Sequence, residues 1–117
     1  MDTESALSAL NALSQSTRLE IFRLLVRHEP DGLPAGDVAR HLDVPQNTIS
    51  AHLATLTRAG LLTSQRHSRL IVYRACLPRL RDLMIFLVRD CCAGSPELCA
   101  PLVANLSSCC PSRESCP

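Results

Sequence analysis

The segment DVARHLDVPQNTISAHLATLTRAG, residues 37–60, constrains the fold of this 117-residue chain more than any other stretch. Apolar residues recur at helical spacing over Asp37–Leu42 and again from about Gln46 to Ala59. A Val-Pro pair interrupts the pattern between them, and Gly60 suits the left-handed backbone that ends many helices. The segment therefore predicts two helices joined by a tight turn, which is the helix-turn-helix pattern.

The longer of these two helices is expected to have a core side and a polar side. On a helical wheel Ile49, Leu53 and Leu56 face the core. The side chains expected opposite them, or at the leading end, are small or carry amides: Gln46, Asn47, Ser50, Ala51 and Ala54. Amides can hydrogen-bond adenine edges and an alanine methyl can contact thymine, so this face suits the major groove of DNA. An ordinary solvent-exposed helix face has the same polarity and is the alternative.

Three more residues of that helix have other expected roles. Thr48 and Thr55 flank the polar face and are candidates for phosphate contacts. His52 lies close to the buried edge, where packing or a phosphate contact suits it at least as well as base reading.

Regular elements are also expected on the N-terminal side of this segment. Ser5–Leu13 places leucines three apart among alanines and predicts a short amphipathic helix. A second helix is expected to run to about His28, with Thr17 and Glu20 at capping-box spacing or a preceding serine as its cap.

On the C-terminal side, LLTSQRH and LIVYRAC predict two strands, with RHSR at the hairpin tip. A final helix is predicted from Pro78 to Cys92 and is apolar almost all round. A helix of that kind in so short a chain needs more covering than one domain supplies. We therefore expect it to form a dimer interface, rather than to be the buried core helix of a monomer.

The basic residues gather in the same part of the chain. Net charge is only +1, but between Val38 and Arg89 eight arginines stand against two aspartates. A basic region of this kind favours binding to a polyanion such as nucleic acid, the alternative being a solvated basic surface.

The order of these elements resembles that of the winged helix-turn-helix repressors of the ArsR/SmtB family. The resemblance covers about Leu10 to Arg89 and rests on STRLEIFRLL, DVARHLDVPQNTISAHLATLTRAGLL and SRLIVYRA, with NTISAHL and RAGLL as its most specific parts. It implies a mainly α fold with a small β-hairpin wing (α+β), and a homodimeric repressor of double-stranded operator DNA. By matching position, the residues implied to read bases or to carry the wing's contacts are Gln46, Asn47, Ser50, Arg66, His67 and Arg69.

The N-terminus and the apolar runs bear on the compartment. MDTESALSAL is acidic and lacks the basic start and apolar core of a secretory signal, and no apolar run reaches the roughly 18 residues that span a bilayer. We therefore expect a cytoplasmic protein, without a membrane partner, whose seven cysteines are reduced thiols. Clustered thiols in a reducing compartment favour metal binding or redox chemistry.

Six of the seven cysteines fall in DCCAGSPELCAPLVANLSSCCPSRESC, residues 90–116. Twice an adjacent pair is followed by a third cysteine, giving Cys91, Cys92 and Cys99 and then Cys109, Cys110 and Cys116. In the resemblance, members that bind arsenic in the best-known way carry cysteines on the first helix of the helix-turn-helix. This chain reads AGDVARHL there, so that site does not transfer.

The cysteine triads indicate which ligand they would take. Trivalent arsenic takes three thiolates on one side, and no histidine follows His67 to favour an ion that prefers imidazole. We therefore predict that Cys91, Cys92 and Cys99 bind arsenite, or antimonite, as inducer. The second triad is either a secondary site or simply a thiol-rich tail.

Other interpretations of the thiols stay open. A repressor of the same fold that responds to thiol oxidation is one, and a sensor of another soft metal such as cadmium or bismuth is another. An enzyme is not expected, because the chain has no C-x-x-C motif, nucleotide loop or catalytic His–Cys pairing. Cys76, alone at a strand end, is expected to be structural. The predicted division is a DNA-binding and dimerisation domain, residues 1–92, and a cysteine-rich tail with the metalloid site, residues 93–117, with no permanent cofactor.

Overall fold

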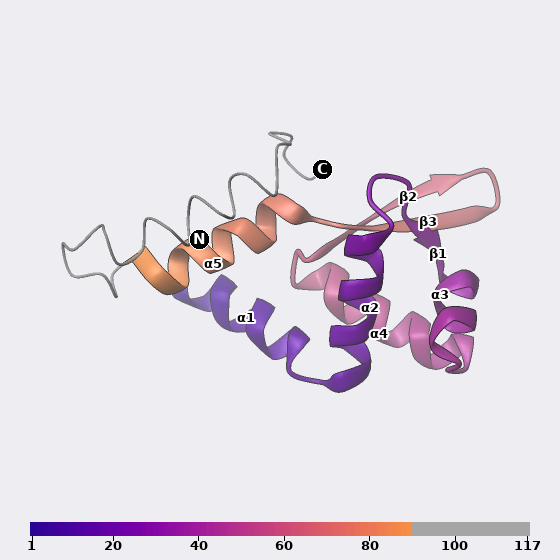
Figure 1. Ribbon diagram of the computed structural model, residues 1–117, viewed down its shortest axis with the longest axis horizontal. Coiled ribbons are helices and arrows are strands. Elements are labelled where there is room, and N and C mark those ends of the chain that lie inside the picture. The colour runs from indigo at the N-terminus through magenta and orange to yellow at the C-terminus, as the bar shows by residue number, and fades with distance from the viewer. Residues whose placement is uncertain (90–117) are drawn as a thin grey trace.

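The computed structural model describes residues 1–89 of the chain (Figure 1). Its elements follow one another as α1 (Thr3–Leu13), α2 (Ser16–Arg27), β1 (Leu33–Pro34), α3 (Ala35–Leu42), α4 (Gln46–Arg58), β2 (Leu62–His67), β3 (Leu70–Ala75) and α5 (Leu77–Arg89). Figure 1 shows α1 and α5 together at one end of the molecule and the β2–β3 hairpin projecting at the other. The predicted architecture, mainly helical with a hairpin wing, is confirmed.

The sheet has three antiparallel strands in the order β1-β3-β2, whereas the sequence predicted only the hairpin. β1 is 2 residues long and pairs Leu33 with Tyr73 and Pro34 with Val72. A proline is tolerated there because β1 is an edge strand. This third strand ties the base of the hairpin to the segment that precedes α3.

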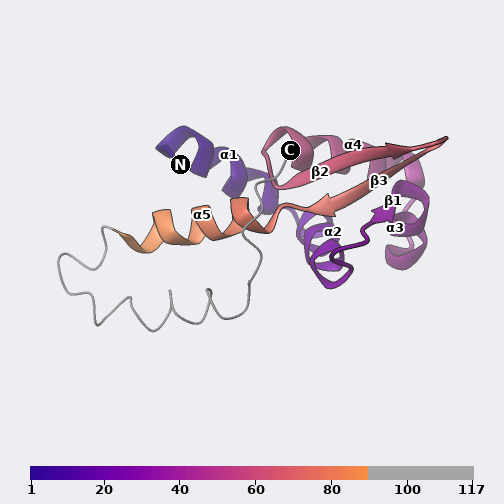
Figure 2. The same cartoon turned by 90° about the horizontal axis from the view of Figure 1, so that it is seen from above.

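The wing, defined as β2, β3 and the turn between them, ends in a tight tip. Pairing continues to His67 opposite Leu70, so Ser68 and Arg69 alone form the turn. Ser68 has a φ of 60°, in the left-handed region that two-residue hairpin turns require. Seen from above, the two strands taper to a point away from α1 and α5 (Figure 2).

The core lies beneath α4 and the base of the wing. The largest fully buried side chains are Ile21, Leu25, Val38, Ile49, Leu53, Leu56 and Leu61. All three α4 residues predicted to face inward are among them, which confirms the predicted core side of that helix. α4 is thus fixed to the body by its apolar side.

α1 packs on the body mainly through alanines, with Leu13 partly buried against the core at its C-terminal end. The buried residues are Ala6, Ala9 and Ala12, each at most 2% exposed. Leu7 and Leu10 are 60% and 39% exposed. The helix begins at Thr3, two residues before the predicted start.

The start of α2 also differs from the prediction. Gln15 is the cap, and its side-chain oxygen accepts a hydrogen bond from the Arg18 amide at 2.8 Å. The predicted capping box of Thr17 and Glu20 is therefore wrong, as is a serine cap.

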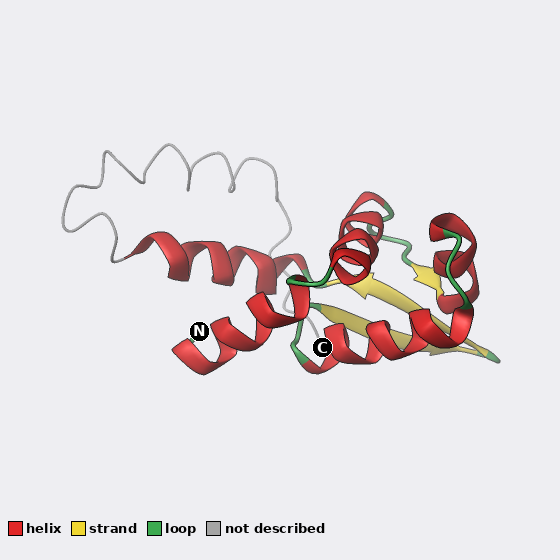
Figure 3. Ribbon diagram, turned by 90° about the horizontal axis from the view of Figure 1, so that it is seen from below, coloured by secondary structure: helices red, strands yellow, loops and turns green. Residues whose placement is uncertain are grey.

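α5 buries a single side chain of residues 77–89 in the chain's own core. Leu83 is 3% exposed, whereas Leu87 is 44% exposed. Viewed from below, α1 lies alongside α5 (Figure 3), and the two helices are in contact. Among residues 1–89, both helices of this layer therefore carry large apolar side chains that are more than a third exposed.

Two predicted features lie outside the described residues. These are the last turn of the predicted Pro78–Cys92 helix and the boundary between residues 92 and 93. Among the helices of residues 1–89, none has the length and apolar character needed to cross a membrane.

Candidate nucleic-acid interface

α3 and α4 form the predicted helix-turn-helix. Asp43 ends α3 in the left-handed region, with a φ of 55°, and its amide donates to the Ala39 carbonyl. The Val44 amide donates to the same carbonyl at 3.2 Å. Because Pro45 then caps α4, only three residues separate the two helices. The turn is tight and holds α4 at a fixed angle to α3.

The outward side of α4 carries the residues that the sequence assigned to DNA. The exposed side chains are Gln46, Asn47, Thr48, Ser50, Ala51 and Ala54, and Thr55 is half-buried. They surround the end of α4 that follows the turn and continue along its outward face. Their exposure agrees with the predicted face, and their contacts with DNA stay predictions.

Asn47 has a local hydrogen bond that orients its amide. Its Oδ1 accepts from the Thr48 amide at 2.9 Å. Pro45 offers no side-chain cap, so this bond satisfies one of the amides left open in the first turn of α4. The Asn47 NH2 and the second lone pair of Oδ1 are still available to a base edge.

His52 lies on the body side of α4 and not on the exposed face. Its ring is half-buried, and its Nδ1 is 3.5 Å from Nη1 of Arg18 on α2. Of the roles open to it from the sequence, packing between helices is the one that this position favours.

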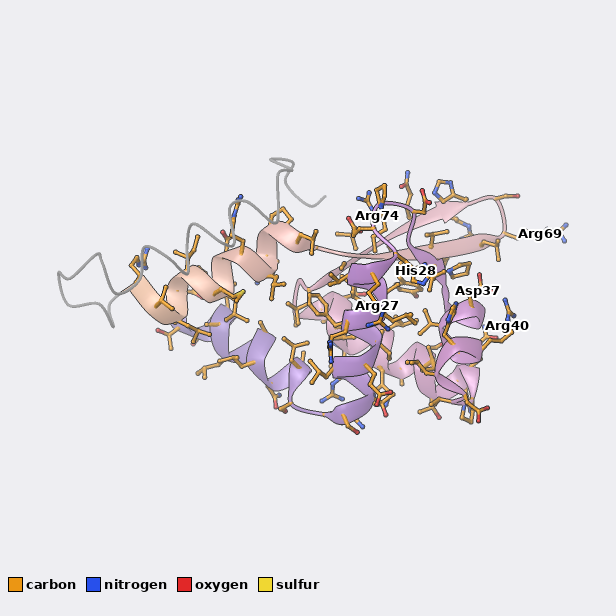
Figure 4. The ribbon with its side chains drawn as sticks, viewed as in Figure 1. Arg27, His28, Asp37, Arg40, Arg69 and Arg74 are labelled. Atoms are coloured by element: carbon orange, nitrogen blue, oxygen red, sulfur yellow. The ribbon has the colours of Figure 1, made fainter. Side chains whose placement is uncertain are left out.

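The wing presents the three basic residues assigned to it. Arg66, His67 and Arg69 are all exposed. Arg66 Nε donates to the Ser68 carbonyl at 3.3 Å, which steadies the tip. Arg69 points away from the body at the end of the wing (Figure 4). A guanidinium in this position can reach a phosphate backbone beside the surface that α4 contacts.

The predicted basic region is partly neutralised within the chain. Arg74 of β3 forms a two-pronged ion pair with Glu29, at 3.0 and 3.2 Å. Arg40 of α3 pairs with Asp37 one turn earlier (Figure 4 labels both). These two arginines therefore contribute less to the free positive charge than the sequence count suggests.

Arg40 is also a candidate that the sequence did not single out. An open hollow over the helix-turn-helix turn is lined by Gly36, Ala39, Arg40, Asp43, Val44, Pro45 and Gln46. The Arg40 side chain is 76% exposed, and it lines this hollow together with Gln46, at the edge of the exposed face of α4. We call that exposed face the reading face. Only the fold brings the two together, and its charge makes Arg40 a further candidate for a phosphate contact.

The described cysteine is Cys76, at the end of β3. It is 4% exposed, which agrees with the structural role predicted for it. That all seven cysteines are reduced stays a prediction. The two triads, Cys91, Cys92, Cys99 and Cys109, Cys110, Cys116, lie outside the described residues. Within residues 1–89, no group of three or more His, Cys, Asp or Glu side chains is placed to hold a metal ion.

The chain is similar to known regulators of transcription. Residues 13–65 match a helix-turn-helix domain family. The transcriptional activator HlyU of Vibrio cholerae is 26% identical over 94 residues, covering 80% of this chain and 84% of HlyU. The transcriptional repressor SdpR of Bacillus subtilis is 28% identical over 91 residues, covering 78% of this chain and 98% of SdpR.

A solved structure extends the similarity to the whole fold. The ArsR-like transcriptional regulator from Rhodococcus sp. RHA1 superposes with a TM-score of 0.70 and 33% sequence identity. The match covers 83% of this chain and 89% of the Rhodococcus protein.

Proposed function

Because the chain belongs to the ArsR/SmtB-like family of winged helix-turn-helix transcriptional regulators, we propose that it is a cytoplasmic, homodimeric repressor that trivalent arsenic or antimony releases from operator DNA. The observation that carries the DNA-binding part is the outward face of α4. Six small or polar residues of α4 are exposed on this face, and the apolar residues on the opposite side of the helix are fully buried.

The reading face and the wing have different proposed roles in DNA recognition. Base edges, contacted from Asn47 and Ser50, supply specificity. Phosphates, contacted from Arg69 and the other wing residues, supply affinity and register, and they make binding depend on salt. Both surfaces lie toward the end of the molecule opposite the C-terminal end of α5 (Figure 1).

The dimer is supported by the uncovered apolar side chains of α1 and α5. Leu7 and Leu87 are 60% and 44% exposed, and they belong to helices that contact each other. Apolar area removed from water contributes roughly 25 cal/mol per Å², so a second copy covering this layer would stabilise the assembly. A two-fold dimer would present one α4 to each of two half-sites.

The inducer part rests on the cysteines that follow α5 in the sequence. Cys91 comes two residues after Arg89, the last described residue of α5, and Cys92 and Cys99 complete the primary triad. A ligand releases a repressor only by binding its non-DNA-binding state better. A shift of α5 would move the two α4 helices away from the roughly 34–36 Å that separates successive major grooves. A coupling of about 3 kcal/mol would change operator affinity more than a hundredfold.

A thiol-oxidation response is the second candidate, and the two adjacent cysteine pairs, Cys91–Cys92 and Cys109–Cys110, favour it. In that case an oxidant, and not a metalloid, would shift the repressor between its two states. The two candidates share the fold and the DNA-binding face and differ only in the signal.

The experiment is a gel-shift on DNA from the protein's own promoter, titrated in parallel with arsenite, zinc, cadmium and peroxide. Arsenite should release the wild-type protein, and single Cys→Ser changes at Cys91, Cys92 or Cys99 should abolish that release while DNA binding survives. X-ray absorption should show three sulfur ligands on arsenic. Changes in the second triad should have smaller effects, and the ion that releases DNA distinguishes an arsenic sensor from a cadmium sensor.

The peroxide arm of the titration separates the two candidates. Under the oxidation proposal peroxide releases the wild-type protein and arsenite does not, whereas under the metalloid proposal arsenite releases it and Cys76→Ser has no effect on that release. Arsenite release that persists in all three primary-triad variants would contradict the assigned site. Loss only in the Cys109, Cys110 and Cys116 variants would transfer the site to the second triad.

A further inference from the structure

One arginine of the described chain joins three helices through its side chain. Arg18, in the first turn of α2, donates from Nε to the Ala12 carbonyl of α1 at 2.6 Å. Its Nη2 donates to the Asn11 carbonyl at 3.5 Å. Its Nη1 lies 3.5 Å from Nδ1 of His52 on α4. The guanidinium thus bridges the C-terminal end of α1 and the recognition helix.

The positive charge suits the end of α1. The last four carbonyls of a helix lack partners within the helix, and that end carries a partial negative charge. α1 has no basic residue in its last turn, and Ser14 satisfies only the Asn11 carbonyl from its own amide and hydroxyl. Arg18 therefore supplies from α2 the cation that α1 itself lacks.

The contact with α4 is made through an acceptor of His52. A guanidinium has donors only, so a hydrogen bond at this junction uses Nδ1 as the acceptor. His52 follows Ser50 and Ala51 directly, so its packing bears on the part of α4 that carries the reading face.

α1 is also the helix that leaves Leu7 and Leu10 uncovered, and it lies alongside α5 (Figure 3). A partner that covers α1 and α5 therefore contacts a helix, α1, whose C-terminal end is linked to α4 by Arg18. α1 also packs directly on α4, and Arg18 adds to that packing a polar connection between its own side chain, two main-chain carbonyls of α1 and the His52 ring.

We propose that Arg18 is a positioning residue for DNA reading: it transmits the placement of α1 in the dimer to α4, and so sets the separation of the two recognition helices. The inference rests on the proposed function, because it requires a homodimer that reads two half-sites. Arg18 and His52 need not touch DNA in this role.

The test is a set of fluorescence-anisotropy titrations of the full chain on three duplexes: the selected two-half-site operator, the same operator lengthened by two base pairs between half-sites, and a single half-site. Arg18→Gln should bind the selected operator about tenfold more weakly. Its affinity for the single half-site should stay within about twofold of wild type. Its preference for the selected spacing over the lengthened one should shrink, which a loss of stability alone would not cause.

His52 variants provide the matched control. The side-chain oxygen of His52→Asn can take the place of Nδ1 and should keep the wild-type spacing preference, whereas His52→Leu has no acceptor and should behave as Arg18→Gln does. The double variant Arg18→Gln/His52→Leu should lose no more than the weaker-binding single variant, because both changes break one junction. If Arg18→Gln does not fold, the two His52 variants carry the same comparison, since they leave the contacts with α1 intact.

Equal losses on all three duplexes, or an unchanged spacing preference in every variant, would overturn this inference and leave the proposed function standing. A wild-type protein that binds none of the duplexes above the level of scrambled DNA would overturn the proposed function, and this inference with it.

Discussion

The two ends of the molecule both expose side chains that the chain itself does not use, but their chemistry is opposite. At the reading end, α3, α4 and the wing expose polar groups such as Asn47, Ser50 and Arg69. At the assembly end, α1 and α5 expose Leu7 and Leu87. Exposed polar groups are satisfied by water, whereas exposed leucines cost about 25 cal/mol for each Å² in contact with it. The polar end is thus well solvated by itself, whereas the exposed leucines of the other end favour a partner, which in our proposal is a second copy of the chain.

The support beneath each end differs in the same way. α4 is anchored by Ile49, Leu53 and Leu56, all 0% exposed, so the chain itself fixes its reading face. α5 has one comparable anchor among its described residues, Leu83. In the proposed dimer, the placement of each α4 would therefore be set within one chain, and the distance between the two α4 helices would be set by assembly.

The largest expected effect comes from charging the assembly end. Leu7→Asp combined with Leu87→Asp should give monomers by light scattering at micromolar concentration, because carboxylates cannot be buried unpaired between two copies. Loss of the second half-site should weaken operator binding by on the order of a hundredfold or more.

The matched control is Leu70→Asp, since Leu70 is 57% exposed but lies on the wing, and this variant should stay dimeric. Leu83 of the same helix is not a suitable target, because at 3% exposure it belongs to the chain's own core and an aspartate there would unfold the protein. A Leu7→Asp/Leu87→Asp protein that remains dimeric would remove the distinction between the two ends.

At the reading end, Asn47→Ala or Ser50→Ala should weaken operator binding by about 1–3 kcal/mol and relax sequence preference without changing the oligomeric state. Anisotropy on matched and singly mismatched duplexes measures both effects. Ser8→Ala, an exposed serine of α1, is the control and should bind as wild type. Unchanged affinity and selectivity in both α4 variants would contradict the assigned reading face.

Gly60 lies where α4 and α5 meet, because it follows the C-terminal end of α4 and lies against Arg79 of α5. Its φ is +82°, and a Cβ there would come within 2.8 Å of Arg79 Nε. Gly60→Ala should therefore lower the free energy of unfolding by about 1–3 kcal/mol in a denaturant titration. Gly36→Ala is the control, since its nearest contact would be an ordinary 3.5 Å to Gln46. Equal stability of the two variants would mean that α5 does not pack on the end of α4 in this way.

The smallest expected effect concerns the wing tip. Arg69→Ala should weaken binding to all sequences alike and reduce the slope of log K against log salt by about 0.9, the contribution of one phosphate contact. Arg81→Ala removes the same charge at the assembly end and should leave the slope unchanged. A slope altered equally by both would show that net charge, and not the position of Arg69, governs binding.

The sequence predicted most of the fold because most of its elements have local signatures. The helical spacing of α4 and the β-rich runs of the wing identified elements whose buried sides are set by periodicity. β1 has no such signature: Leu33 and Pro34 lie in a stretch rich in turn residues, and only pairing with β3 makes them a strand. The cap at Gln15 was missed because serine and threonine are the common cap residues.

The facing of α1 could not be predicted for a different reason. Its leucines and its alanines both recur at helical spacing, and periodicity does not say which stripe turns inward. Ala6, Ala9 and Ala12 pack inward while Leu7 and Leu10 stay exposed, which is expected if a second copy covers these two leucines. In the candidate site, the exposed residues of α4 followed from the spacing of its buried ones. The junction of Arg18 with His52 did not, because 34 positions separate them in the sequence.

The central claim, that this chain reads DNA through α4 as a two-fold dimer, is tested most directly by selecting bound duplexes from a random library and titrating the enriched sequence. The expected product is an inverted repeat whose half-sites are centred about 10–10.5 base pairs apart, or a multiple of that. It should bind roughly a thousandfold or more tighter than a scrambled duplex at physiological salt. Enrichment of no repeat, or equal affinity for the enriched and scrambled duplexes, would contradict the claim.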